Sequence, residues 1–212
     1  LKLTAGLDHQ RSRSRGSISY LGFPLFNSEG QQNQFPSSFS SASRDNRFNT
    51  NSTTAFAALE QSLAENWKLK FSVNHLRSSQ REDAVYLGVN AAPFDPVTGD
   101  GLKLNAERRD YRLRNKTFDI HVRGPITLAG REHELVFGMD HTSFQSYTDG
   151  SLDVSGLRDK PVNIYQWDNS GKPVFNNPTV AYDSTRSQSS VYGAGRFALA
   201  DSLKLIVGGK LM

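Results

Sequence analysis

Residues 67–74 read WKLKFSVN and carry the clearest repeating pattern in the chain. The apolar residues Leu69, Phe71 and Val73 occupy every second position after Trp67, and lysine, serine and asparagine fill the positions between them. Successive side chains of a β-strand point to opposite faces, so a period of two gathers the apolar ones on one side. The stretch therefore predicts a strand with one apolar face and one polar face.

Six further segments repeat this alternation along the chain. With the first, the predicted strands are residues 1–11, 52–63, 67–74, 117–123, 134–140, 187–200 and 203–211. A helical period of 3.6 residues is not sustained anywhere in the sequence. Because brief turns join the strands in pairs, the sequence predicts an all-β, antiparallel up-and-down meander of about seven strands.

The predicted connections alternate between long and short. Long polar segments lie at 12–51, 79–110 and 148–186, and turns lie at 64–66, 128–131 and 200–202. Loops longer than about 12 to 15 residues are uncommon in compact domains, whereas outer-membrane barrels combine short turns on one side with long loops on the other. The alternation favours a barrel wall over a soluble all-β binding module. For part of segment 79–110, the alternative is an extension of the two flanking strands.

The composition excludes several classes of protein. Aromatic residues make up 10% of the 212 residues, which argues against a disordered chain. No run reaches the roughly 18 apolar residues of a transmembrane helix, whereas a membrane β-strand needs only about 9 to 11 residues. The chain contains no cysteine, and therefore no disulfide and no thiolate ligand or nucleophile.

The net charge of +4 is spread along the chain and forms no extended basic surface in the sequence. One local exception is the alternation of Arg11, Arg13 and Arg15 with serine. A nucleic-acid site needs a larger focused patch. We therefore expect a solvated or lumen-facing strand end here, and no nucleic-acid partner.

Charged side chains of the predicted strands fall opposite the apolar rows. They are Lys68, Lys70, Asp119, His121, Arg123, Glu134, Asp140, Arg196, Lys204 and Lys210. A wet lumen would solvate them, whereas a Lys or Arg at the lipid midplane would cost about 2 to 4 kcal/mol. An open sheet cannot stand alone in hydrocarbon, and the sequence starts and stops inside strand patterns. We therefore expect the chain to be cut from a larger barrel.

Four segments resemble the barrel region of TonB-dependent ferric-siderophore receptors, in particular those for ferric coprogen, ferrioxamine and pyoverdine. The segments are 55–70, 130–138, 163–168 and 192–206, which read AFAALEQSLAENWKLK, GREHELVFG, NIYQWD and YGAGRFALADSLKLI. Each segment is weak alone, but they occur in the order found in the family. The resemblance covers most of the chain.

The resemblance implies a barrel of about 22 strands, closed by an N-terminal plug, in the outer membrane of a Gram-negative bacterium. Residues 1–212 would form one partial barrel domain, because no stretch resembles the plug, the TonB box or the C-terminal strand. The transported ligand would be a ferric siderophore, with no cofactor. Partners would be the TonB-ExbB-ExbD complex, acting through the plug, and outer-membrane lipid or lipopolysaccharide. A passive porin-like barrel is the alternative.

Candidate ligand-binding residues lie in or beside the long connections. A receptor for a chelate supplies aromatic surface and polar groups, because the chelator already fills the coordination shell of the iron. The aromatic candidates are Tyr86, Phe94, Tyr147, Tyr165 and Trp167, and the candidates for pairing with an anionic chelate are Arg108, Arg109 and Arg112. The alternative for each residue is packing within its own loop or a place in the interfacial aromatic girdle.

Metal and catalytic chemistry find little support in the sequence. His121, His133 and His141 fall on different predicted strands or turns, without the helical spacing of a zinc site. Asp95 and Asp100 lack the calcium-loop pattern and are predicted turn formers. The G-x-S-x-G motif of a serine hydrolase is absent, so we expect no enzymatic activity.

Overall fold

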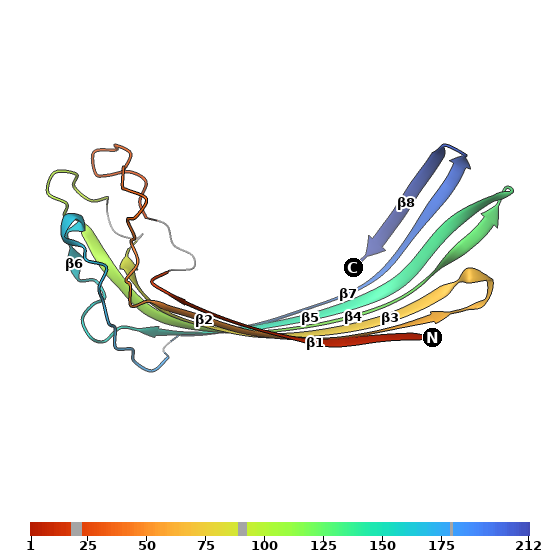
Figure 1. Ribbon diagram of the computed structural model, residues 1–212, viewed down its shortest axis with the longest axis horizontal. Coiled ribbons are helices and arrows are strands. Elements are labelled where there is room, and N and C mark those ends of the chain that lie inside the picture. Colours follow the sequence, from red (N-terminus) through yellow and green to blue (C-terminus); the bar gives the residue numbers. More distant parts are fainter. Residues whose placement is uncertain (18–22, 89–92, 179) are drawn as a thin grey trace.

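The computed structural model describes residues 1–17, 23–88, 93–178 and 180–212 (Figure 1). The strands are β1 (Lys2–Arg15), β2 (Arg47–Ser62), β3 (Lys68–Leu87), β4 (Leu102–Leu128), β5 (Arg131–Leu152), β6 (Pro161–Val162), β7 (Val180–Ala200) and β8 (Leu203–Leu211). Two short 3-10 helices, η1 (Ala64–Asn66) and η2 (Ile164–Gln166), lie in the connections. Among the described residues, no helix is long and apolar enough to cross a membrane.

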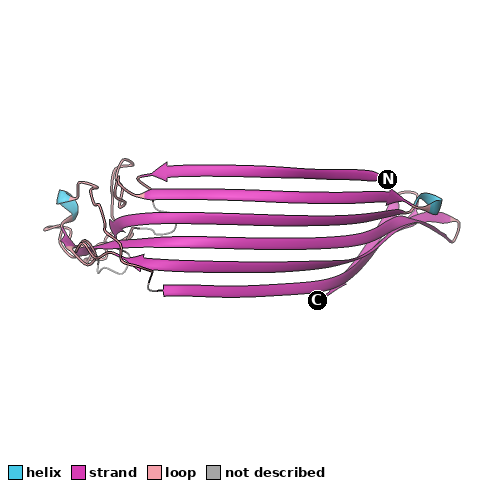
Figure 2. Ribbon diagram, turned by 90° about the horizontal axis from the view of Figure 1, so that it is seen from below, coloured by secondary structure: helices cyan, strands magenta, loops and turns pink. Residues whose placement is uncertain are grey.

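The strands form one curved sheet in a single layer (Figure 2). Their order is β1-β2-β3-β4-β5-β7-β8, and every neighbouring pair is antiparallel. The two-residue strand β6 lies off this path and pairs with the start of β4. The predicted antiparallel meander is confirmed.

Short turns and long connections lie at opposite ends of the sheet (Figure 2). Ala129 and Gly130 join β4 to β5, both with positive φ (54° and 72°). Two-residue hairpin turns of this kind match the twist of the flanking strands. The three long connections, β1 to β2, β3 to β4 and β5 to β7, leave the sheet at the other end. The predicted alternation of short and long connections is confirmed.

The strands run much further than the apolar pattern indicates. The connection expected at 79–110 is shorter, because β3 continues to Leu87 and β4 begins at Leu102. This confirms the extension of the flanking strands that the sequence left open. Residues 89–92 of it lie outside the described residues. Likewise, β7 starts at Val180 instead of residue 187. The extensions start with mostly polar residues, 79–83 in β3 and 107–116 in β4, which interrupt the apolar alternation and are held by backbone pairing. Residues 84–87 and 102–106 at the far ends are mostly apolar again, and their apolar side chains are buried.

One face of the sheet carries a continuous row of apolar side chains. Directly paired residues of successive strands form this row: Leu3, Leu59, Phe71, Ile120, Met139, Val191 and Leu211. We call this row, with the apolar residues two positions away on each strand, the apolar belt. The side that carries it is the belt face, and the other side is the opposite face. The alternation seen at 67–74 thus extends across the whole sheet.

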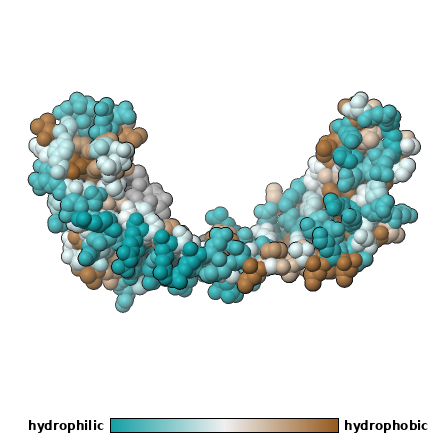
Figure 3. Space-filling model, in the orientation of Figure 1, coloured by the Kyte–Doolittle hydropathy of each residue, from teal (hydrophilic) through white to brown (hydrophobic). Residues whose placement is uncertain are grey.

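No second layer covers the apolar belt within the described part of the chain. Phe137 and Leu205 of the belt are 51% and 46% exposed. Figure 3 shows apolar side chains along the convex underside of the sheet, in the half nearer the short turns. A soluble sandwich would bury such a face against another sheet about 10 Å away. The alternative of a soluble two-layer module is therefore wrong.

The opposite face holds charged residues that pair with one another. Lys210 Nζ lies 2.7 Å from Asp140 Oδ2, and the Tyr192 hydroxyl donates to Asp119 over 2.7 Å. Lys68 reaches Glu60 at 3.9 Å, also on this face. All ten charged residues expected opposite the apolar rows lie here by register. Charged side chains are costly in lipid, so the opposite face must border water. The belt face is then the side that can contact lipid.

A histidine side chain repairs the backbone ladder at one irregularity. The β7–β8 register shifts between Ala198 and Ala200. The Nδ1 atom of His133, which is 7% exposed, accepts the Ala198 N–H over 2.9 Å, and Nε2–H donates to the Leu128 carbonyl over 3.1 Å. The ring therefore satisfies a strand amide at the bulge and is occupied by structural hydrogen bonds.

Replacing Phe71 with lysine tests the orientation of the belt. Phe71→Lys is expected to lower the free energy of unfolding in lipid vesicles by about 2 to 4 kcal/mol, because it places a cation in hydrocarbon. The matched variant Ser72→Lys points to the opposite face, beside Asp119 in the register, and should cost little. Urea titrations of vesicle-folded protein measure both. Equal losses for the two variants would contradict the assignment of faces.

Removing the acceptor atom of His133 tests whether its ring stabilises the register shift at Ala198. His133→Leu leaves the Ala198 N–H without a partner and is expected to cost about 1 to 3 kcal/mol. His133→Gln keeps an acceptor at this position and should recover part of the loss. The same urea titration compares the variants, and identical stability of all three proteins would exclude the proposed role of the ring.

Candidate functional site

The three long connections gather at one end of the sheet. Their described residues, 16–17 and 23–46, 88 and 93–101, and 153–178, form what we call the loop cluster. Figure 1 shows them folded beside the rising ends of β3 and β4. Loops positioned by a rigid scaffold are the usual place for binding residues. This end of the molecule is therefore the candidate site.

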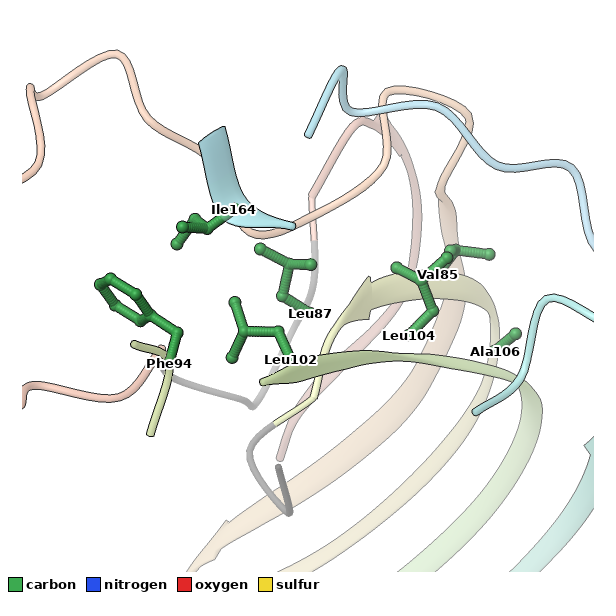
Figure 4. Packing of buried hydrophobic residues seen from close by; sticks show 7 residues of the cluster. All are labelled: Val85, Leu87, Phe94, Leu102, Leu104, Ala106 and Ile164. Carbon is green, nitrogen blue, oxygen red and sulfur yellow. The ribbon is translucent and has the colours of Figure 1, made fainter. Parts of the chain in front are cut away.

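The loop cluster has an apolar core of its own. Side chains from the ends of β3 and β4 form one side, and residues from two connections close it (Figure 4): Val85, Leu87, Leu102, Leu104, Ala106, Phe94 and Ile164. The rings of Phe23, Phe35 and Phe39 pack against this core, and Phe35 and Phe39 stack with centroids 4.3 Å apart. Burial of this kind holds long loops in a single arrangement.

Hydrogen bonds join the three connections in pairs. The Ser28 N–H donates to the Phe94 carbonyl over 3.0 Å, which ties the first connection to the second. The Ile164 N–H donates to the Gly99 carbonyl over 2.8 Å, which ties the third to the second. The Trp167 indole N–H donates to the Ser40 carbonyl over 3.0 Å, which ties the third to the first. The loop cluster is therefore one cross-linked body.

Acidic residues of the loop cluster shape turns. Asp95 accepts the backbone N–H groups of Thr98 and Val97 over 2.9 and 2.7 Å, and these bonds lower the pKa of its carboxyl. The hydroxyl and backbone N–H of Ser170 likewise lower the pKa of Asp168. In the described part of the chain, no group of three His, Asp or Glu side chains could hold a metal ion. Asp95 is a turn former, as its sequence context predicts.

Three of the predicted ligand contacts are held inside the loop cluster. Tyr86 is 4% exposed, and its hydroxyl donates to Glu107 over 3.0 Å. Phe94 is 3% exposed within the aromatic core. Trp167 packs against the same core. These side chains support the surface of the site.

Two other predicted contacts lie at the loop end and on the opposite face. Tyr165 is 61% exposed, although its hydroxyl donates to the Pro96 carbonyl over 2.5 Å. Arg109 shares the opposite face with His121 by register and pairs with Glu107 at 2.9 Å. Contact of either residue with a chelate stays a prediction.

The last three predicted contacts lie on the belt face. Arg108 pairs with Asp83 at 2.6 Å and lies over the Phe175 ring, 4.6 Å from its centroid. The guanidinium of Arg112 lies 5.2 Å from the Tyr147 ring centroid. The eight predicted residues therefore divide between the two faces and the loop core, and the structure does not bring them together at one point.

The sequence analysis missed exposed apolar residues on the loop surface. Phe26 is 53% exposed and Val97 81% exposed. Val97 lies in the turn that Asp95 shapes, so the run of Pro, Asp and Gly at 93–101 was the available signal. Phe26 follows Pro24 in a polar connection, where single apolar residues carry no pattern. Such side chains leave apolar surface exposed on the loop cluster.

Comparison with known proteins agrees with this architecture. Residues 2–211 match the family model described as TonB dependent receptor-like, beta-barrel. The ferripyoverdine receptor of Pseudomonas aeruginosa is 29% identical over 213 residues, covering 99% of this chain and 25% of that protein. The ferric-pyoverdine 358 receptor of Pseudomonas putida is 27% identical, over 97% of this chain and 24% of that protein. The chain thus spans about a quarter of the length of these relatives.

A solved structure shows the same fold. The crystal structure of the ferripyoverdine receptor of the outer membrane of P. aeruginosa, bound to ferripyoverdine, superposes with a TM-score of 0.84 at 27% identity. The match covers 98% of this chain and 27% of that one. Sheet order, belt and loop placement agree with a barrel wall. The chain belongs to the TonB dependent receptor-like β-barrel family, and its location is the bacterial outer membrane.

Proposed function

We propose that this chain is part of the wall of a receptor that takes up a ferric siderophore of the pyoverdine class, energised through TonB. One observation carries the proposal: the chain shares its fold over 98% of its length with a receptor solved with ferripyoverdine bound. The relatives from P. aeruginosa and P. putida are both ferric-pyoverdine receptors.

The geometry of the chain supports a receptor more than a passive porin. All three long connections rise from the same end of the sheet, and their cross-links fix one shared surface. The loop cluster at this end presents the exposed side chains of Tyr165 and Val97, which supply aromatic and apolar surface for a bulky chelate. Because the chelator already surrounds the iron, this surface needs no metal ligands of its own and no cofactor.

The remaining parts of the proposal concern the full-length protein. Residues 1–212 form part of its barrel domain, and a barrel of about 22 strands encloses a plug. The TonB-ExbB-ExbD complex acts through that plug to supply energy, and the belt contacts outer-membrane lipid and lipopolysaccharide. Transport involves no covalent step, which is consistent with relatives that are receptors and not enzymes.

Gene deletion with complementation tests the transport function. Iron-starved cells that lack the full-length gene are expected to lose uptake of at least one labelled ferric pyoverdine from a panel, and complementation should restore it. Inactivating TonB in the complemented strain should abolish uptake again, whereas a passive porin would continue to conduct. Unchanged uptake of every chelate after deletion would contradict the proposal.

A pair of β4 variants tests which face meets the chelate. Arg109→Gln removes a cation from the opposite face and is expected to weaken binding of an anionic chelate about tenfold or more, the worth of one charged hydrogen bond. Arg114→Gln removes the same charge from the belt face and should leave chelate binding unchanged. Fluorescence titration of the purified receptor with ferric pyoverdine measures both. Equal effects would refute binding on the opposite face.

A further inference from the structure

The third long connection crosses the wall at the loop end. After leaving β5 it runs beside the start of β4, where β6 pairs with that strand. Residues 167–171, which we call the strap, then reach residues 40–44 of the first connection. That segment lies beside the other edge of β3, where Ala42 forms a bridge to Tyr86. The third connection therefore passes over both β4 and β3.

The crossing takes place on the side of the belt face. Gly171 of the strap lies against Val85, because a Cβ atom at Gly171 would meet the Val85 side chain at 2.9 Å. Just beyond the strap, the Phe175 ring lies under the guanidinium of Arg108. Val85 and Arg108 both belong to the belt face by register. Figure 1 agrees, since the third connection lies on the convex side of the rising ends of β3 and β4 and the first connection lies on the concave side.

Hydrogen bonds to the backbone join the strap to the first connection. The side-chain amide of Asn169 donates to the carbonyls of Ser40 and Ala42 over 2.5 and 3.1 Å. The Trp167 indole N–H donates to the same Ser40 carbonyl over 3.0 Å. In return, the Arg44 N–H donates to the Asn169 carbonyl over 2.8 Å. Because Ala42 is 4% exposed, water cannot readily replace these donors, so the strap stabilises one arrangement of residues 40–44.

A tight turn aims the Asn169 side chain at the first connection. Asn169 has a φ of 58°, in the left-handed region that asparagine and glycine tolerate best. The carboxylate of Asp168 accepts the Ser170 N–H and hydroxyl over 3.0 and 2.7 Å, which fixes the turn locally. The turn is thus held by its own residues, and the Asn169 amide remains available for contact with another segment.

The strap lies behind the first connection as seen from the concave side of the sheet (Figure 1). In the receptor proposed above, the chelate binds at the loop end and along the opposite face, which is the concave side. The first connection presents apolar surface there, with Leu25 and Phe26 70% and 53% exposed. Trp167 is half-buried and packs against the core of the loop cluster. The strap can therefore influence the chelate only through the first connection.

We propose that Trp167 and Asn169 are positioning residues, which hold the first connection in the arrangement that binds the ferric chelate and do not contact the chelate themselves. The sequence predicts Trp167 as a ligand contact, and the proposal gives it a different role. The proposal rests on the proposed function, because it assigns the first connection a share in chelate binding.

Hydrogen exchange of the purified full-length receptor, without chelate, tests the positioning. Asn169→Gly removes the side-chain amide and tolerates the positive φ, so the turn is retained. Amides of residues 40–46 are expected to exchange about tenfold faster, because two hydrogen bonds are lost. The control Ser155→Ala removes a bond to Asp153 in the same connection and should leave this exchange unchanged. Equal exchange in Asn169→Gly and the unaltered receptor, or equal acceleration in the control, would overturn the proposal.

Calorimetric titration with ferric pyoverdine tests the effect on binding. Asn169→Gly and Trp167→Phe should each weaken binding several-fold, because each removes a donor to the Ser40 carbonyl. The double variant should lose less than the product of the two effects, since both act on the same segment. If the Trp167 ring contacts the chelate instead, Asn169→Gly will bind as the unaltered receptor does, which refutes the proposal alone. An unaltered receptor that binds no ferric pyoverdine would refute the proposed function together with it.

Discussion

The pairing of backbone amides across adjacent strands is the constraint on which this structure depends. Within hydrocarbon an unpaired N–H or C=O costs several kcal/mol, so each strand must find a partner along its full membrane-crossing length. The unbroken registers from β1 to β7 meet this demand. Where the register shifts near Ala198, the ring of His133 accepts the displaced amide. The outer edges of β1 and β8 have no partner strand within the described residues.

Because the strands pair in this way, the two-residue period of each strand places apolar side chains on one face of the sheet and polar side chains on the other. The row through Phe71 is apolar in every strand, and the adjacent row through Lys70 is polar or small in every strand. Charges on the opposite face pair with one another, as Lys210 does with Asp140, so that the face can border a wet interior. Cations on the belt face gather instead beyond the belt, toward the loop cluster, where Arg77 and Arg114 meet without a carboxylate. The belt face thus carries these arginines beside closely paired ones, such as Arg81 with Asp110.

The sequence was informative where one face is apolar and uninformative where both are polar. Strand 67–74 and its partners follow from alternation alone, because lipid on one side and water on the other impose opposite demands. The part of β3 from Ser79 to Asp83 left no such trace, since serine, arginine and aspartate suit either side of a solvated strand. The candidate site was harder still. Arg109 and Arg112 look equivalent in sequence, but only the register shows that they point to different faces, and Phe94 is buried by residues from a distant connection.

Because the long connections lie at one end of the sheet, insertions and deletions have different effects in the loops and in the strands. Deleting a single residue inside β3 would exchange its two faces from that point to the turn, placing Lys70 in lipid and Phe71 in water. Loss or gain of residues in 23–46 or 153–178 leaves every register intact, because those segments lie outside the sheet path apart from the short strand β6. Mutation can therefore lengthen, shorten or recombine the loops while the strands keep their frame. Over evolutionary time, such a receptor can acquire new ligands without altering its fit to the bilayer.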